Sequence, residues 1–237
     1  MGSVYALTLR QLTGRWRMTI LTILAALPVL LTMLVLSFSR APDVGEFEMV
    51  VFNAMLAGSI APLVVLAIAT AAFGNEVEDR TLANLTLAPI PRWQIVVPKL
   101  LATMTVAGPF VGASAFITGQ IAFLGDWQAT LAVTASALLG VALYSSAFLW
   151  LGLVSTQAIG VGLLYIVLWE GFFAGFVAGV RLLSVRYLGL AGMHGLDARR
   201  FAGENHVGLV AVITISVLVF GGFLWLTIRR LRRMDVA

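Results

Sequence analysis

Six long apolar runs dominate this sequence and limit what it can fold into. They cover residues 19–38, 52–73, 100–124, 129–153, 159–180 and 207–228. A helix needs about 20 residues to cross the hydrocarbon layer of a bilayer, so each run is long enough for one crossing. Charged residues make up 11% of the chain, against about 25% in an ordinary soluble domain. The sequence therefore predicts an all-α integral membrane protein, with about six transmembrane helices in a single domain over residues 1–237.

The basic residues predict the orientation of these spans, because cytoplasmic loops carry an excess of Lys and Arg. Placing the N-terminus inside puts most of the 15 basic residues on the cytoplasmic side, namely Arg10, Arg15, Arg17, Arg80, Arg92, Lys99, Arg229, Arg230, Arg232 and Arg233. We therefore expect both termini in the cytoplasm of a multi-pass protein of the inner (plasma) membrane. These residues flank apolar runs, which indicates contact with lipid headgroups and no nucleic-acid partner.

The N-terminal segment, residues 1–18, alternates apolar and basic residues. Its apolar members are Leu7, Leu9, Leu12 and Trp16, and its basic members are Arg10, Arg15 and Arg17. This pattern predicts an amphipathic helix in the cytoplasmic headgroup layer, with the tryptophan at its boundary. The alternative is a simple basic anchor that precedes the first span.

A polar segment, residues 74–99, interrupts the apolar sequence between the second and third spans. It holds Glu76, Glu78, Asp79, Arg80, Arg92 and Lys99. Pro89 and Pro91 disfavour helical backbone in the residues before them, so a short helix through 82–87 is expected to end there. From the residues alone, these charges solvate a cytoplasmic loop and fix the topology.

Two stretches resemble the ABC-2 type permeases, the membrane subunits of ATP-binding-cassette exporters. The first carries acidic residues, then Thr-Leu, a further Leu, a Pro-x-x-Arg element and a Lys that opens the next span: Glu76, Glu78, Thr81, Leu82, Leu85, Pro89, Arg92 and Lys99. The family often has a glycine where this chain has Arg80. The second stretch, Tyr165–Gly189, resembles the family's fifth span and the external stretch after it. With six spans and internal termini, the resemblance extends over nearly the whole chain.

The resemblance implies a transport function. In the family, the cytoplasmic segment after the second span docks on the ATPase, which would make Glu76, Glu78, Asp79, Arg80, Thr81 and Arg92 the coupling residues here. It also implies a half-transporter that pairs with a second copy or a sister permease, above two ATPase subunits. A lipid-like, peptide or drug-like export substrate is expected. The alternatives are an ATPase-coupled membrane assembly factor and an autonomous secondary carrier.

Glu170 is the one acidic residue well inside a predicted span. Such a carboxylate is costly in lipid and faces protein or a cavity. It is either a proton-relay group, which would suit the secondary carrier, or part of an internal structural hydrogen bond. After it, residues 181–206 form an external stretch long enough for a re-entrant or interfacial helix.

The sequence lacks the residues that several kinds of chemistry require. The chain has no Walker A pattern, so ATP must be bound by a partner, and we expect no cofactor and no enzymatic activity of its own. It contains no cysteine and two histidines without an H-E-x-x-H pattern, so no metal site is expected.

Overall fold

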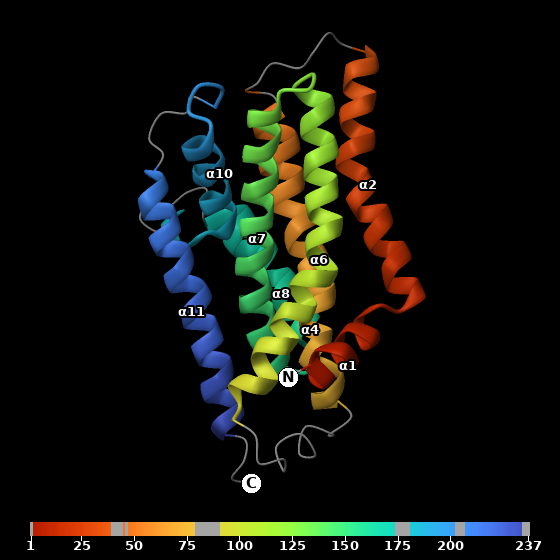
Figure 1. Ribbon diagram of the computed structural model, residues 1–237, viewed down its shortest axis with the longest axis vertical. Helices are drawn as coiled ribbons and strands as arrows, with labels where there is room; N and C mark the ends of the chain where they lie inside the picture. Colours follow the sequence, from red (N-terminus) through yellow and green to blue (C-terminus); the bar gives the residue numbers. More distant parts are fainter. Residues whose placement is uncertain are drawn as a thin grey trace.

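The computed structural model describes residues 2–38, 45, 47–78, 91–173, 181–201 and 207–233, and the statements below concern these residues. They form a helical bundle (Figure 1). Its elements are α1 (Gly2–Leu12), α2 (Arg15–Phe38), η1 (Phe47–Ile60), α4 (Ala61–Glu78), α6 (Trp93–Ala122), α7 (Trp127–Val154), α8 (Ala158–Leu164), η2 (Tyr165–Phe173), η3 (Arg181–Leu183), α10 (Val185–Leu196) and α11 (Leu209–Arg233).

The membrane character predicted from the sequence is confirmed by helix length and hydropathy. Five described helical segments are long and apolar enough to cross a bilayer: Arg15–Ser37, Met49–Gly74, Trp93–Ala122, Trp127–Val154 and Leu209–Arg233. They correspond to five of the predicted spans. The remaining predicted span, 159–180, begins with a shorter apolar helix over Ala158–Phe172, and residues 174–180 lie outside the described residues.

The start of the chain and the end of α11 lie at the same end of the bundle (Figure 1). We call this end, which also carries the start of α6, the basic end. Its described arginines are Arg10, Arg15, Arg17, Arg92, Arg229, Arg230, Arg232 and Arg233. By the rule that relates basic residues to topology, this end is the one expected to face the cytoplasm.

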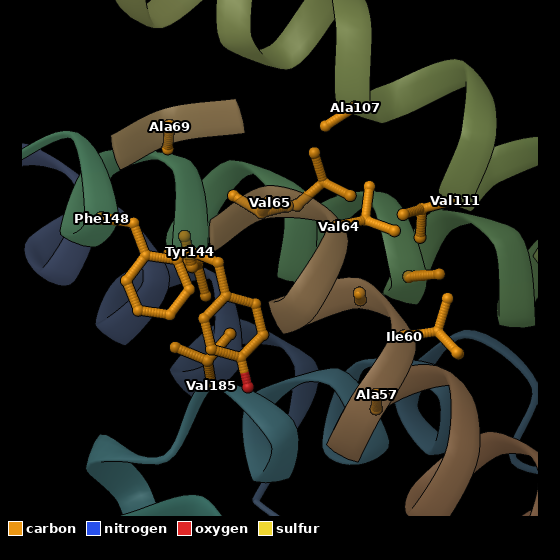
Figure 2. Packing of buried hydrophobic residues seen from close by; sticks show 14 of the residues in the cluster. Ala57, Ile60, Val64, Val65, Ala69, Ala107, Val111, Tyr144, Phe148 and Val185 are labelled. Carbon is orange, nitrogen blue, oxygen red and sulfur yellow. The ribbon is translucent and has the colours of Figure 1, made fainter. Parts of the chain in front are cut away.

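Helix α7 is the centre of the bundle, because α4, α6, α8, α10 and α11 all pack against it. Figure 2 shows the packing of buried residues from α4, α6 and α7, among them Val64, Ala107 and Phe148. Helices α7 and α4 approach closely at Gly152, where an added Cβ would lie 2.6 Å from the carbonyl oxygen of Thr70. Only the absence of a side chain at this position permits the contact between α7 and α4.

At the end of the bundle opposite the basic end, a short turn joins α6 to α7. Gly125 supplies the left-handed backbone of this turn with φ +86°. The Asp126 side chain then caps α7 by accepting hydrogen bonds from the backbone N–H groups of Gln128 and Ala129. Asp126 also pairs with Arg200, whose guanidinium nitrogen lies 2.5 Å from its carboxylate. The cap and the ion pair tie the segment after α10 to the start of α7.

Helix α1 crosses the basic end and packs against α6 and α4. The Tyr5 hydroxyl donates a hydrogen bond to Thr105 Oγ1 of α6 at 3.1 Å, and Leu12 is fully buried. Trp16, at the start of α2, is 84% exposed, as expected of an aromatic residue at a membrane boundary. The contacts anchor α1 to the bundle, and its position in the headgroup layer remains a prediction.

The chain between α7 and α11 runs along α7 in two helical pieces, and both pieces travel away from the basic end. The first, α8 with η2, contacts the end of α7 and continues upward. The second, α10, begins beside the middle of α7, and its Gly192 lies near Ser136, closer to the start of α7. Helix α10 therefore lies inside the bundle, packed against α7 and α11, instead of lying across its end.

Candidate functional site

The predicted coupling segment, residues 74–99, includes the last residues of α4 and the first residues of α6. Lys99 of α6 is 1% exposed, and its ammonium group lies 2.6 Å from a carboxylate oxygen of Glu76. The same ammonium group donates to the backbone carbonyl of Ala72 and lies 4.7 Å from the centre of the Phe73 ring. A buried ammonium is tolerated only when it is paired and hydrogen-bonded in this way. Lys99 thus clamps the start of α6 to the last turns of α4.

The predicted coupling residues have different surroundings. Glu76 lies within α4 and faces Lys99, and its side chain is 16% exposed. Arg92 is the N-cap residue of α6 and is half-buried. The side chain of Glu78, and all of Asp79, Arg80 and Thr81, lie outside the described residues. Helices α4 and α6 extend to Glu78 and from Trp93, so the connecting segment is shorter than the predicted 74–99.

Beside this clamp, the basic end contains a pocket of about 570 Å³ between α2, α4 and the connection from α7 to α8. Its lining residues are Arg17, Ala67, Thr70, Ala71, Gly74, Ser155, Thr156, Gln157, Ala158, Ile159 and Gly160. Small apolar residues of α4 form one wall, and the polar residues of the α7–α8 connection form another. A pocket with one cation, several hydroxyls and apolar walls suits an amphipathic molecule.

Glu170 of η2 is 1% exposed and accepts hydrogen bonds from the start of α10. The donors are the Ser184 hydroxyl at 2.5 Å, the Val185 N–H at 3.0 Å and the Arg186 N–H at 3.4 Å. The Tyr165 hydroxyl donates to the same carboxylate at 3.1 Å. A carboxylate at a helix N-terminus satisfies N–H groups that have no partner within the helix and interacts favourably with the helix dipole.

Arg186 makes a second set of contacts between α10 and η2. Its guanidinium donates to the backbone carbonyl of Glu170 at 3.2 Å, and its side chain passes Gly58 of η1, where an added Cβ would lie 3.4 Å from it. Figure 2 shows Tyr144 of α7 directed toward Val185 at the start of α10. Glu170 therefore sits at the junction of η2, α10, η1 and α7, near the middle of α7. This environment favours the structural alternative for Glu170 over a proton relay.

Sequence reasoning missed the partners that define these two sites. Lys99 was noted for its position before a span, but its apolar neighbours on both sides already indicate a buried cation that needs a carboxylate. Ser184 is of a residue type favoured at N-caps, and its hydroxyl accepts from the Tyr187 N–H, although nothing in the sequence links it to Glu170.

The comparisons with known proteins agree with the architecture. A family model described as ABC-2 family transporter protein matches residues 12–187, from the end of α1 to the start of α10. The match includes the Lys99 clamp, the pocket at the basic end and Glu170. No curated protein matches the chain. The family model matches most of a chain that folds into several apolar helices long enough to cross a membrane. The two observations together indicate a membrane protein that takes part in transport. The chain belongs to the ABC-2 transporter family.

Proposed function

We propose that this chain is the permease subunit of an ATP-binding-cassette exporter in the inner (plasma) membrane, with its basic end in the cytoplasm. Two permeases, as a homodimer or with a sister chain, would enclose the pathway, and two separate ATPase subunits would drive it. Family membership carries the transport function. The observation that supports coupling at the basic end is the clamp between Lys99 and Glu76.

The clamp supports a mechanical role for the coupling segment, because it joins the two helices to which the segment is attached. A segment whose two ends are attached to one pair of packed helices would pass the movement of a bound ATPase to both helices as a rigid-body motion. Here the segment connects Glu78 to Pro91, and the buried pair of Lys99 with Glu76 holds those two helices together just inside it. Glu78, Asp79 and Arg80 are then the contacts to the ATPase, whereas Glu76 serves the clamp.

The pocket at the basic end supports a pathway shared between two permeases. Its wall at α8 continues into a row of exposed apolar side chains on α8 and η2, with Ile159, Leu163 and Val167 at helical spacing. A second permease against this row would close the pocket from the side. The mixture of apolar walls with Arg17 and hydroxyl groups favours a lipid-like, peptide or drug-like substrate that carries a polar or anionic group.

Affinity purification from native membranes in mild detergent tests the coupling proposal. The tagged wild-type chain should retain a protein with a Walker A sequence, and the variant Glu78→Ala/Asp79→Ala should lose it. Glu76 is left intact, since its removal would also break the clamp. The matched control is Glu46→Ala/Glu48→Ala, which removes two carboxylates from the predicted external loop and should retain the ATPase.

Three results would contradict this proposal in different ways. Absence of any ATPase from an intact, monodisperse wild-type sample would favour an autonomous carrier, and transport by Glu170→Gln would then be the next measurement. Equal retention by both double variants would move the docking site away from residues 78–79. A captured ATPase whose activity drives no transport in vesicles would favour the membrane assembly factor.

A further inference from the structure

A second pocket at the basic end lies between the last turns of α7 and α11. It has a volume of about 280 Å³ and is lined by Trp150, Val154, Leu226, Arg229, Arg230 and Arg233. The four residues from α11 follow an i, i+3, i+4, i+7 spacing, so they share one face of that helix. Such a face normally presents apolar residues to its neighbour, but here three of its four positions hold arginine.

The charge of this pocket defines its ligand class. Ion pairs between described side chains join Lys99 to Glu76 and Arg200 to Asp126, so within that part of the chain no carboxylate neutralises the three arginines of the pocket. Each guanidinium presents a planar set of donors that matches two oxygens of a phosphate. Trp150, Val154 and Leu226 provide an apolar floor beneath these donors. A ligand that suits both parts has a phosphate joined to an apolar body.

The position of the pocket across the membrane matches the headgroup layer of a bilayer. Arg229 lies 20 residues beyond Leu209, the first residue of α11, which is about 30 Å along a helix axis and about one hydrocarbon thickness. Trp225, one turn earlier, is 56% exposed, and the Arg229 guanidinium lies 4.9 Å from the centre of its ring. Tryptophan at this depth is typical of the interface between hydrocarbon and headgroups.

The exposure of α11 favours a lipid as the ligand of this pocket. Only 11% of its most apolar stretch is buried in the bundle, and Val217 and Leu218 are more than 60% exposed. In a bilayer, acyl chains would therefore contact α11 on the hydrocarbon side of the pocket. Its volume equals roughly nine water molecules at about 30 Å³ each, enough for a headgroup but not for acyl chains as well.

We propose that α7 and α11 form a binding site for the headgroup phosphate of an anionic glycerophospholipid from the leaflet at the basic end. The arginines bind the phosphate, the apolar floor contacts the glycerol region, and the acyl chains lie along the exposed surface of α11. This site requires neither the ATPase nor a transport substrate, so it stands apart from the proposed function.

Native mass spectrometry of the delipidated full-length protein tests this proposal. Dioleoylphosphatidylglycerol and dioleoylphosphatidylcholine are compared, because they share acyl chains and differ in net charge. The wild type should bind the anionic lipid more tightly. In Arg229→Gln/Arg230→Gln/Arg233→Gln, the dissociation constant for the anionic lipid should rise roughly 100-fold, because each arginine near an anionic surface contributes about 1 kcal/mol.

Two further variants separate the pocket from general charge and from misfolding. The control Arg10→Gln/Arg15→Gln/Arg232→Gln removes the same charge from exposed positions at the same end that line neither pocket, and it should bind the anionic lipid as the wild type does. Val154→Trp fills the pocket and leaves all three arginines, and it should also weaken binding. If the triple glutamine variant of α11 fails to fold, Val154→Trp by itself decides whether the pocket is used.

Several outcomes would overturn the lipid site. One is unchanged binding of the anionic lipid by the α11 triple variant or by Val154→Trp. Another is an equal loss in the Arg10/Arg15/Arg232 control, which would indicate non-specific attraction. Competition by millimolar inorganic phosphate as strong as that of the lipid would indicate a free-anion site. Retained lipid with loss of the co-purified ATPase would assign the arginines to an acidic protein surface.

Discussion

The ammonium group of Lys99 lies 2.6 Å from a carboxylate oxygen of Glu76, joining the start of α6 to the end of α4 across 23 residues of sequence. Lys99 is 1% exposed, whereas the Glu76 side chain is 16% exposed. The two partners therefore differ in how easily water can replace a lost contact. This difference in exposure predicts which single substitution lowers the free energy of unfolding more.

Glu76→Gln should lower the free energy of unfolding by on the order of 3 kcal/mol, because it leaves the deeply buried ammonium of Lys99 without a charged partner. Lys99→Met should cost less, since Met packs well and Glu76 remains near water. The double variant should cost less than the sum of the two, with a coupling of about 1–3 kcal/mol. Denaturant unfolding of the purified protein measures all three. Arg15→Gln, an exposed site at the same end, is the control, and strictly additive effects would contradict the clamp.

Gly152→Ala should destabilise the contact of α7 with α4 by about 1–3 kcal/mol, as expected for overpacking. The added Cβ would lie 2.6 Å from the Thr70 oxygen and 2.9 Å from its Cα, and neither backbone atom can move easily. Gly140 is the matched control, because a Cβ there has no atom within 4 Å and Ala is the better helix former. Thermal unfolding should therefore separate the two variants, and equal midpoints would refute the close approach.

Removal of the carboxylate at Glu170 should destabilise the start of α10 in a graded order. Glu170→Ala leaves the donors of Tyr165, Ser184 and Val185 without their acceptor, at about 1–3 kcal/mol for each buried group. Glu170→Gln keeps one oxygen but turns an amide N–H₂ toward donors, so it should be intermediate. Ser184→Ala should cost about 1 kcal/mol, the usual value of an N-cap. Denaturant unfolding measures the order, and wild-type stability of Glu170→Gln would favour a neutral carboxyl group and revive the proton-relay alternative.

Asp126 should make stability depend on pH in the acid range. The Ala129 N–H, with help from the Arg200 guanidinium and the Gln128 N–H, lowers the pKa of this carboxyl below its ordinary value near 4. A lowered folded-state pKa stabilises the protein above the unfolded pKa, and this contribution is lost as pH falls through the folded pKa. Asn keeps the helix cap but not the charge. The difference in melting temperature between wild type and Asp126→Asn should therefore be present at pH 7 and should shrink as the pH falls below the ordinary carboxyl pKa near 4 and through the lower folded-state pKa. A difference that is constant with pH would contradict this role.

The dimer proposal predicts where two permeases meet. The chain contains no cysteine, so one introduced residue reports on one position. Leu163→Cys lies on the proposed row of α8 and Ile213→Cys lies on α11, and the native residues are 41% and 55% exposed. If the permease is a homodimer, oxidation in native membranes should link Leu163→Cys to the same cysteine of a second copy and leave Ile213→Cys monomeric. The reverse pattern would place the interface on α11.

The sequence alone determined the membrane fold, because apolar runs of crossing length leave a chain no other stable arrangement in a bilayer. It also indicated the basic end, since arginines are too costly to leave in hydrocarbon. The resemblance to the ABC-2 family could also be recognised from the sequence alone. The polar segment between the second and third spans contrasts with its apolar surroundings, and its motif can be recognised without knowing its contacts.

Tertiary structure decided the contacts of individual polar residues. Glu76 belongs to a motif that suggests ATPase contact, yet its partner is Lys99, and Glu170 became a helix cap only because α10 starts beside it. The sequence left a re-entrant and an interfacial helix open for residues 181–206, and it did not indicate that α10 packs against α7 and α11. These outcomes depend on contacts between residues far apart in sequence. Hydropathy and periodicity describe how a residue relates to its solvent and to its own helix, and not which other helix it meets.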